Sequence, residues 1–352
     1  MALTPHIAVP PEPAQGRVTE PSTIDDMTAE PTLKVFEPQQ SLATTTDQMS
    51  ATVVDQHVFL RGRPPLTQFL DFVMNEAVDG DKLDRGRLAS DWRDANDRLR
   101  ELESEEAGHA DSPTIEPLPP ELLAVQERLL ADPILQRVFN IVPVSIGLVN
   151  LDTLVVFQKH INLAHVSRIQ NGLGTAPTPE QVIACCLPFE HVQPPVQLRR
   201  IANNAYAFVS PSDDLRFLEG TLLAPTQISE HTPYGPVTGV VALMVGFGTN
   251  YLNAISVENR LILNNGSHRA YALRDLGLTQ APCLIQHVSR REELDALTNS
   301  LEPDPDLYLK SSRPPLLKDY FDEQLRKVIA VPRKLRQITV AFHIQQVDVP
   351  AI

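Results

Sequence analysis

The sequence predicts an α+β (mixed α/β) fold, and three observations lead to this prediction. Apolar residues recur at helical spacing in segments 87–105 and 121–139. Runs rich in β-branched residues, which are typical of strands, occupy 142–154 and 237–247. Between 261 and 286 the pattern reads as strand, glycine turn, helix, glycine stop and second strand. Helical and strand patterns therefore alternate along the chain, which is typical of a mixed fold.

The N-terminal third is predicted to hold a tail and a helical arm. Residues 1 to about 50 are rich in Pro, Thr, Glu and Gln and have no apolar period, which indicates a disordered tail. We expect a helical arm over 51–118, with one helix opening after Pro64 and Pro65 and a second, highly charged helix at 87–105. Segment 107–120 is small, acidic and proline-bearing, and it is interpreted as a linker.

The remaining chain is divided into a domain at 119–290, with a long insertion, and a C-terminal extension at 291–352. In the domain we expect a helix at 121–139 broken at Pro133, strands at 142–154, 205–210, 237–247, 251–256 and 261–263, a short helix at 179–186 capped by Thr178, and a helix or turn at 212–218. The run 237–247 is expected to be buried on both faces. In the extension we expect helices at 290–299 and 315–328, a loop at 302–306 and a half-buried strand at 337–347.

Composition excludes several classes of protein. The chain has 352 residues and a net charge of −14, which disfavours broad DNA binding because phosphate contacts need Lys and Arg. Its three cysteines cannot form a disulfide framework. The N-terminus lacks the pattern of a signal peptide, and the longest apolar run, 237–248, is shorter than the ~20 residues that span a bilayer. The sequence therefore predicts a cytoplasmic protein without membrane contact.

The most informative segment is the turn Asn265-Gly266-Ser267-His268-Arg269. A strand that enters a helix through glycine aims free backbone N–H groups and the helix dipole at one point, which suits a phosphate. Gly266 would allow close approach, Ser267 would cap the helix or donate to the phosphate, and His268 and Arg269 would add hydrogen bonds or charge. We therefore predict nucleotide or phosphate binding by these four residues.

This turn resembles the second box of the ParB N-terminal-domain and sulfiredoxin superfamily, and 144–154 is similar to its first box. The resemblance covers about 140–288. It implies a domain of that type, in which the helix N-terminus grips nucleotide phosphates, so that the expected ligands are ATP, ADP or CTP with Mg²⁺. It also implies that the loop after the first box faces the site, so Gln158 and His160, together with Asn265, are possible additional contacts.

Where the sequence departs from the family pattern, some activities of the superfamily become less favoured. Ser267 stands where sulfiredoxins carry cysteine, and a hydroxyl has no thiolate form at neutral pH, which disfavours sulfiredoxin activity. No helix pair of the DNA-reading kind follows residue 286, which disfavours a partition role. Free-serine kinases of the superfamily keep a Gly-x-His-Arg turn, so nucleotide hydrolysis or phosphotransfer stays open. Asp213, Asp214 and Glu219 would supply a carboxylate base if the insertion folds over the site.

Two functions from different classes remain. One is binding of a nucleotide or related phosphate compound, which leaves open whether the protein is an NTPase or phosphotransferase. The alternative is a non-catalytic structural or interaction protein that retains the fold, with a protein partner on the N-terminal arm. Binding requires Arg269 to face an open pocket, whereas the alternative expects it to pair with an internal carboxylate. No metal site is expected, because His160 and His165 are five residues apart and no His-Glu-x-x-His pattern occurs.

Overall fold

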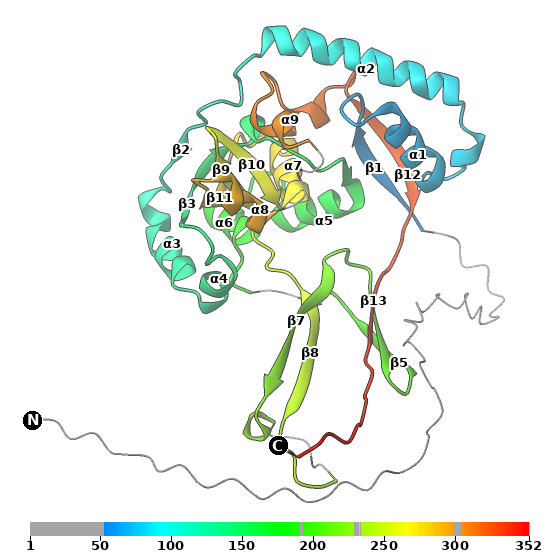
Figure 1. Ribbon diagram of the computed structural model, residues 1–352. Coiled ribbons are helices and arrows are strands. Elements are labelled where there is room, and N and C mark those ends of the chain that lie inside the picture. Colours follow the sequence, from blue (N-terminus) through cyan, green and yellow to red (C-terminus); the bar gives the residue numbers. More distant parts are fainter. Residues whose placement is uncertain are drawn as a thin grey trace, which may run out of the picture. The chain divides into compact units, whose positions relative to one another are not determined.

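The structure is a computed structural model that describes residues 53–351 except 191–192, 229–231, 233, 299–300 and 302–303. Its helices and mixed sheets confirm the predicted α+β class (Figure 1). The predicted N-terminal tail lies outside the described residues. The described helices are α1 (Leu66–Glu76), α2 (Arg85–Glu105), α3 (Leu123–Leu130), α4 (Pro133–Val138), α5 (Leu163–Leu173), α6 (Pro179–Cys186), α7 (Ser267–Asp275), α8 (Arg291–Leu297) and α9 (Pro305–Leu309).

The strands form four sheets among the described residues. They are β1 (Val54–Leu60), β2 (Ile115–Glu116), β3 (Val144–Asn150), β4 (His160–Asn162), β5 (Gln197–Ala202), β6 (Ala205–Ser210), β7 (Leu215–Leu223), β8 (Val240–Phe247), β9 (Asn253–Val257), β10 (Arg260–Asn265), β11 (Gln280–His287), β12 (Arg326–Pro332) and β13 (Arg336–Ala341). The sheet orders are β10-β9-β11-β3-β2, β12-β1-β4, β13-β6-β5 and β7-β8.

The five-stranded sheet carries the main core and positions the site. β11 pairs antiparallel with β3 and parallel with β9, and its residues from Ala281 to Ile285 are buried. Helices α6 and α7 pack against β11. Since α7 follows β10 directly, its N-terminus lies at the end of this sheet. The predicted order of strand, glycine turn, helix and strand over 261–286 is therefore confirmed.

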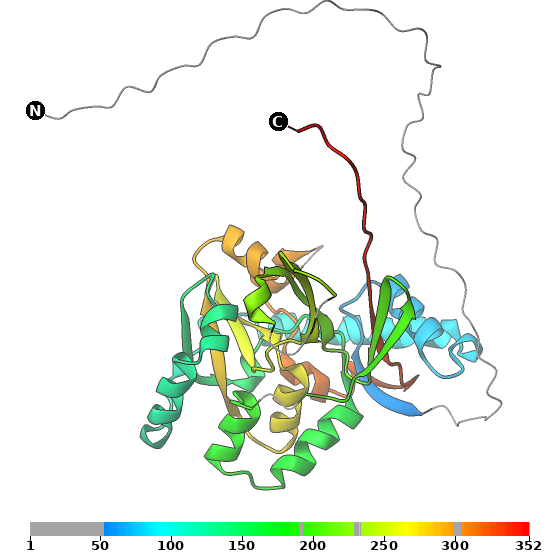
Figure 2. The same ribbon diagram turned by 90° about the horizontal axis from the view of Figure 1, so that it is seen from below.

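A strand near the start of the described chain and one from its last tenth lie in the same sheet. β1 pairs antiparallel with β12 along its whole length, and in Figure 2 these strands lie side by side. β4 pairs with the other edge of β1. Phe59, Phe69 and Val73 are buried together with Ile329 of β12, so α1 packs on this sheet. The predicted domain boundaries at 118 and 290 stay predictions, but pairing across them is extensive.

Several predicted helices are confirmed. α1 begins after Pro65 and buries Phe69, Leu70 and Val73, and α2 buries one stripe of its surface. The helix at 121–139 is interrupted before Pro133, giving α3 and α4. At α6, the Thr178 hydroxyl and the Gln181 amide form a reciprocal capping box. These elements have strong local determinants, namely caps, prolines and a helical apolar period.

Two segment predictions are wrong because their tertiary partners decide the structure. Segment 107–120 is no simple linker, since β2 pairs with the edge of β3 and Ala110 and Leu118 are buried. Segment 315–328 is no amphipathic helix. It forms a short 3₁₀ helix, Leu317–Phe321, followed by β12. Leu317 N–H donates to Leu154 O and Pro315 O accepts from Val156 N–H, so these backbone groups are used by a neighbouring segment.

Other corrections concern burial and short elements. The predicted strand at 237–247 forms as β8, but its burial was predicted wrongly, because among the described strands β8 pairs only with β7 and several of its apolar side chains are exposed. Segment 212–218 turns at 213–214 and then enters β7. The strand predicted at 337–347 ends at Ala341, and the loop predicted at 302–306 gives way to α9 at Pro305. The residues around His160 and His165 lie in β4 and α5, which the sequence interpretation missed.

Pairing of β2 with β3 gives a direct stability prediction at Gly147. A Cβ added there would lie 2.6 Å from Ile115 Cγ2 and 2.9 Å from Glu116 O. Gly147→Ala should therefore cost about 1–3 kcal/mol of unfolding free energy through overpacking. Gly172→Ala is the matched control, since nothing lies within 4 Å of its Cβ and α5 should gain about 0.5–1 kcal/mol. Urea unfolding measures both, and an unaffected Gly147→Ala would contradict the pairing.

Candidate functional site

The turn that leads into α7 is built around Gly266. This residue has φ of +96°, and a Cβ there would lie 2.6 Å from Leu252 Cδ1, so backbone conformation and space both favour glycine. Gly266 itself is the N-cap, and no side chain caps the first turn of α7. Ser267 is therefore not the cap, as one of its two predicted roles required. Its hydroxyl instead donates to Gln158 Oε1 at 3.2 Å. As at other helix starts, the first N–H groups of α7 have no partner within the helix.

Arg269 lies at the base of this turn and is only 6% exposed. Its Nη1 donates to three main-chain carbonyls, those of Cys185, Cys186 and Asn250. No carboxylate forms an ion pair with Arg269 among the described residues. Burial lowers the pKa of the guanidinium, and Asp214 and the nearby thiols act in the opposite direction. The carbonyls fix the side chain without neutralising its charge, so an anion bound beside it would supply the missing partner.

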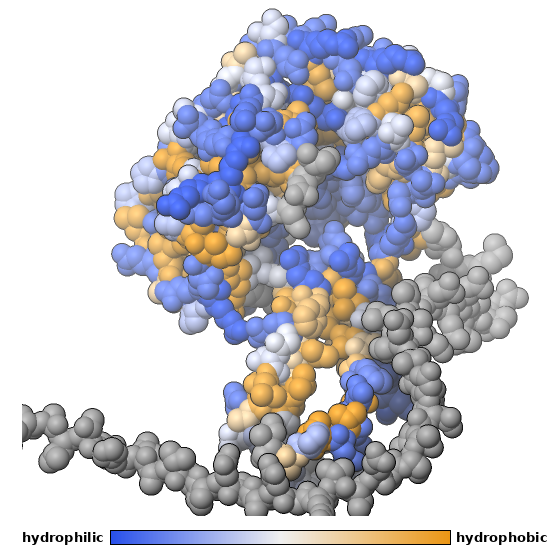
Figure 3. Space-filling model, in the orientation of Figure 1, coloured by the Kyte–Doolittle hydropathy of each residue, from blue (hydrophilic) through white to orange (hydrophobic). Residues whose placement is uncertain are grey.

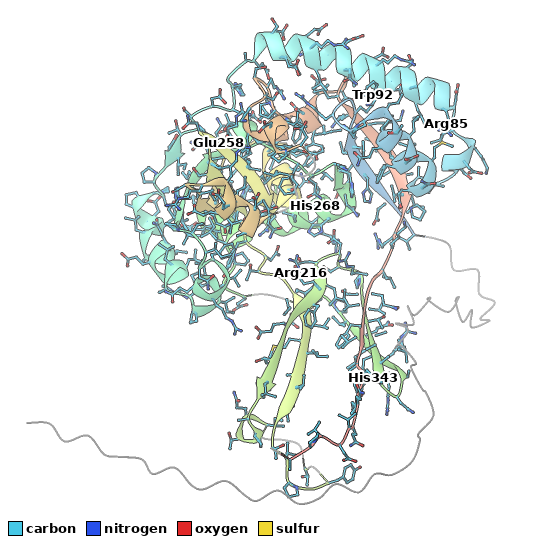
Figure 4. All side chains as sticks on the ribbon, viewed as in Figure 1. Arg85, Trp92, Arg216, Glu258, His268 and His343 are labelled. Carbon is cyan, nitrogen blue, oxygen red and sulfur yellow. The ribbon has the colours of Figure 1, made fainter. Side chains whose placement is uncertain are left out.

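A cavity of about 680 Å³ opens over this turn. Its wall combines residues 264–269 with parts of α5, the end of α6 and the following segment, the loop before β7, and the loop between β8 and β9. The long insertion between the two sequence boxes therefore reaches the site. In Figure 4, His268 lies on α7 and Arg216 at one end of β7, and both residues line the cavity.

His268 is fixed in a neutral form. Its Nε2 accepts the backbone N–H of Asn162 at 3.0 Å, so the ring hydrogen is assigned to Nδ1. Burial first, and then the charges of neighbouring histidines and Arg269, lower its pKa to about 3. His268 therefore offers hydrogen bonding to the cavity at neutral pH, but not the positive charge that the sequence interpretation considered.

The additional predicted contacts divide into two groups. Gln158 and Asn265 line the cavity, and the Asn265 amide donates to Thr249 O and Tyr251 O. His160 does not line it. Its ring is stacked with Phe72 at 5.4 Å in the β1 region, and burial lowers its pKa to about 4. The structure therefore brings Gln158 and Asn265 to the turn, but not His160.

The carboxylates proposed from the insertion also divide. Asp213 and Asp214 line the cavity, and Asp214 pairs with Arg216. Glu219 pairs with Arg137 at 2.7 Å and does not line the cavity. Sequence reasoning missed the role of Asn250 and of the Cys185 and Cys186 carbonyls, since main-chain acceptors leave no pattern in the side chains. No cluster of three or more His, Cys, Asp or Glu side chains within the described ranges is arranged to hold a metal ion.

Comparison of the chain with known proteins gave no match to a family model, a curated protein or a solved structure. None of the helices in the described part of the chain is both long and apolar enough to cross a membrane.

Proposed function

We propose that the protein binds a nucleotide or related phosphate compound in the cavity over α7. The observation that carries the proposal is Arg269, a buried guanidinium held by carbonyls and left without a carboxylate partner beside an uncapped helix N-terminus. Charge-assisted hydrogen bonds from Arg to phosphate are among the strongest that proteins make. An anion at this point would meet the guanidinium, the helix dipole and unpaired N–H groups together.

The cavity has the size and polarity that such a ligand needs. Its volume of about 680 Å³ falls within the range of roughly 300–1,000 Å³ that is usual for small-molecule sites. Gln158 and Asn265 add amide groups on the wall. ATP, ADP and CTP are the ligands that we propose, in keeping with the resemblance to the ParB and sulfiredoxin superfamily. A Mg²⁺ ion in such a site would be coordinated mainly by phosphate oxygens and water, since the described side chains form no metal cluster.

The net charge of −14 disfavours an extended DNA surface, which needs many Lys and Arg side chains, whereas one small anion needs only a local site. We propose the cytoplasm as the location of the protein. None of the described helices is of the membrane-spanning kind, which agrees with this proposal.

A thermal-shift screen with ATP, ADP, CTP and GTP, each with and without Mg²⁺, tests the proposal. A ligand present at about a hundredfold above its Kd should stabilise the folded protein by about 2.7 kcal/mol. Stabilisation by at least one nucleotide is the expected result. If none of the four shifts the melting temperature, the proposed function is wrong.

One observation favours the second candidate function, an interaction protein. Among the described residues the β7–β8 ribbon pairs with no other strand, yet several of its large apolar side chains are exposed, and orange residues gather over it in Figure 3. The most exposed are Leu222 at 74% and Val241 at 72%, which lie directly opposite each other. An exposed apolar patch of this kind is typical of protein contacts. The two functions are compatible, since Leu222 and Val241 do not line the cavity, whereas Arg216 and Phe247, nearer the other end of the ribbon, do.

Self-association is the form of this interaction that the purified chain would show by itself. If the ribbon is the contact, Leu222→Lys combined with Val241→Glu, whose opposite charges do not repel across the strand pair, should lower the molar mass measured by light scattering from a dimer to a monomer. Because both side chains are exposed, the folded state should change by less than about 0.5 kcal/mol per site. A double variant at exposed charged positions, Arg93→Ser with Arg100→Ser, is the control. Identical molar masses for the wild type and both double variants would contradict self-association through this ribbon.

A further inference from the structure

His165 has an unusual position at the edge of the cavity. It lies near the start of α5, where Asn162 Oδ1 accepts its backbone N–H at 3.3 Å. Its ring stacks on His268 with centroids 4.8 Å apart and planes at 26°. The residue lines the cavity and is exposed to it. Its ring is therefore fixed one side chain away from the first turn of α7.

The ring nitrogens of His165 are not used by the fold. Among the described residues they take part in no hydrogen bond or ion pair. His268 differs, because its Nε2 is occupied by the Asn162 N–H. A histidine that is fixed by stacking, with ring nitrogens unused by the described residues and beside an anion site, has the geometry of a proton acceptor.

The surroundings of His165 act on its pKa in two directions. Most of them favour the neutral imidazole, whereas one carboxylate favours the imidazolium. Although the residue is exposed to the cavity, partial burial of its ring is the largest effect and lowers the pKa of His165, and Arg168 on the same helix and Arg269 on α7 act in the same direction. Asp213, from the loop before β7, raises it. His268, stacked on the ring, is itself neutral because its pKa is about 3. At pH 7 the imidazole is therefore unprotonated, and Asp213 would favour the imidazolium formed by proton transfer.

We propose that His165 is the general base for hydrolysis of a nucleoside triphosphate bound at α7, with water as the nucleophile. The inference rests on the proposed function. The water oxygen forms a bond to the terminal phosphorus while the bond from that phosphorus to the bridging oxygen breaks. The water proton passes to His165, and the nucleoside diphosphate leaves with the electron pair of the broken bond. Inorganic phosphate is the second product.

Glu190 is a further carboxylate on the cavity wall, so Glu190→Gln is measured beside His165→Ala, and two other bases are less suited to this role. Asp214 is paired with Arg216, and His268 Nε2 already accepts a hydrogen bond. Asp213 remains as a neighbour that acts on His165 by charge. Asp213 is therefore a positioning residue whose charge raises the pKa of His165, and this effect can be measured separately from the effect of His165 itself. Removing the Asp213 charge should lower the pKa of His165 and move the acid limb of the rate profile to lower pH.

The test measures phosphate release from ATP and from CTP with Mg²⁺ as a function of pH, alongside nucleotide-induced thermal shifts. His165→Ala should lower the rate by about 100-fold or more and retain the thermal shift, and added imidazole should restore part of the rate. Asp213→Asn should retain activity with the acid limb displaced to lower pH. His343→Ala, in the exposed segment after β13, is the matched control and should behave as the wild type.

The outcomes separate the inference from the proposed function. If nucleotides shift the melting temperature but the wild type releases no phosphate, His165 is not a general base and the binding site stands. The same conclusion follows if His165→Ala hydrolyses as fast as the wild type. If no nucleotide binds at all, the proposed function fails and this inference fails with it.

Discussion

Replacing Arg313 by alanine should lower the free energy of unfolding by about 3–5 kcal/mol, a large effect for one substitution. The Arg313 side chain is 1% exposed and that of Asp319 is 3% exposed. Two guanidinium nitrogens donate to the two Asp319 oxygens at 2.6 Å each, and Glu106 accepts from the same side chain at 2.9 Å. Alanine at 313 would leave the Asp319 carboxylate buried without a cation, which is costly.

Urea unfolding followed by the fluorescence of Trp92, the single tryptophan, measures this loss. Arg100→Ala is the control, because its pair with Asp97 is exposed and should contribute less than about 1 kcal/mol. A double variant, Arg313→Met with Asp319→Leu, should recover part of the loss because no charge stays buried alone. Recovery is incomplete since Leu316 N–H loses its Asp319 acceptor. A loss below about 1 kcal/mol for Arg313→Ala would contradict the buried pair.

This pair also supports the candidate site. The segment that contains it hydrogen-bonds to the chain around Leu154 and Val156, and the Tyr320 hydroxyl donates to Gln158 O. Gln158 in turn accepts from Ser267 in the α7 turn. The C-terminal part of the chain therefore holds one wall of the cavity in place.

Removing the Arg269 guanidinium is the second large change that we expect. Arg269→Ala should weaken nucleotide binding by about 10- to 150-fold, because a hydrogen bond to a charged group contributes about 1.5–3 kcal/mol. It should also destabilise the fold by about 1–3 kcal/mol, since the carbonyls of Cys185, Cys186 and Asn250 lose their donor. Melting without ligand and binding measured below the melting range separate the two effects.

Arg269→Lys retains the charge but not the planar fork, so it should bind more weakly than the wild type and more tightly than Arg269→Ala. Arg274→Ala is the matched control on the same helix. Its guanidinium pairs with Asp152 at 3.0 Å, lies over the Phe321 ring and does not line the cavity. Equal affinities for Arg269→Ala and the wild type would place the ligand elsewhere.

The sequence predicts the parts of the site that are local. The strand before Gly266, the left-handed turn and the start of α7 follow from residues adjacent in the chain, and the structure has them there. Ser267 and Asn265 lie at the turn for the same reason. The hydrogen bond from the Ser267 hydroxyl to Gln158 was not predictable in detail, because it joins residues that are far apart in the sequence.

Long-range pairing explains most of what the sequence did not predict. β1 is completed by β12 from the opposite end of the chain, and no local pattern around Val54 indicates that partner. The apolar run of β8 was interpreted as a buried strand, yet apolar composition alone does not specify what covers it. The carbonyls around Arg269 come from the end of α6 and from the loop before β9, so its environment depends on the assembled fold.

Calorimetric titration of ATP and CTP, each with Mg²⁺, into wild type, Arg269→Lys and Arg274→Ala shows whether Arg269 binds the phosphate groups. We expect one-site binding to the wild type, the same affinity for Arg274→Ala, and clearly weaker binding to Arg269→Lys. Absence of binding to the wild type, or equal affinity in all three proteins, would contradict a phosphate site at Arg269.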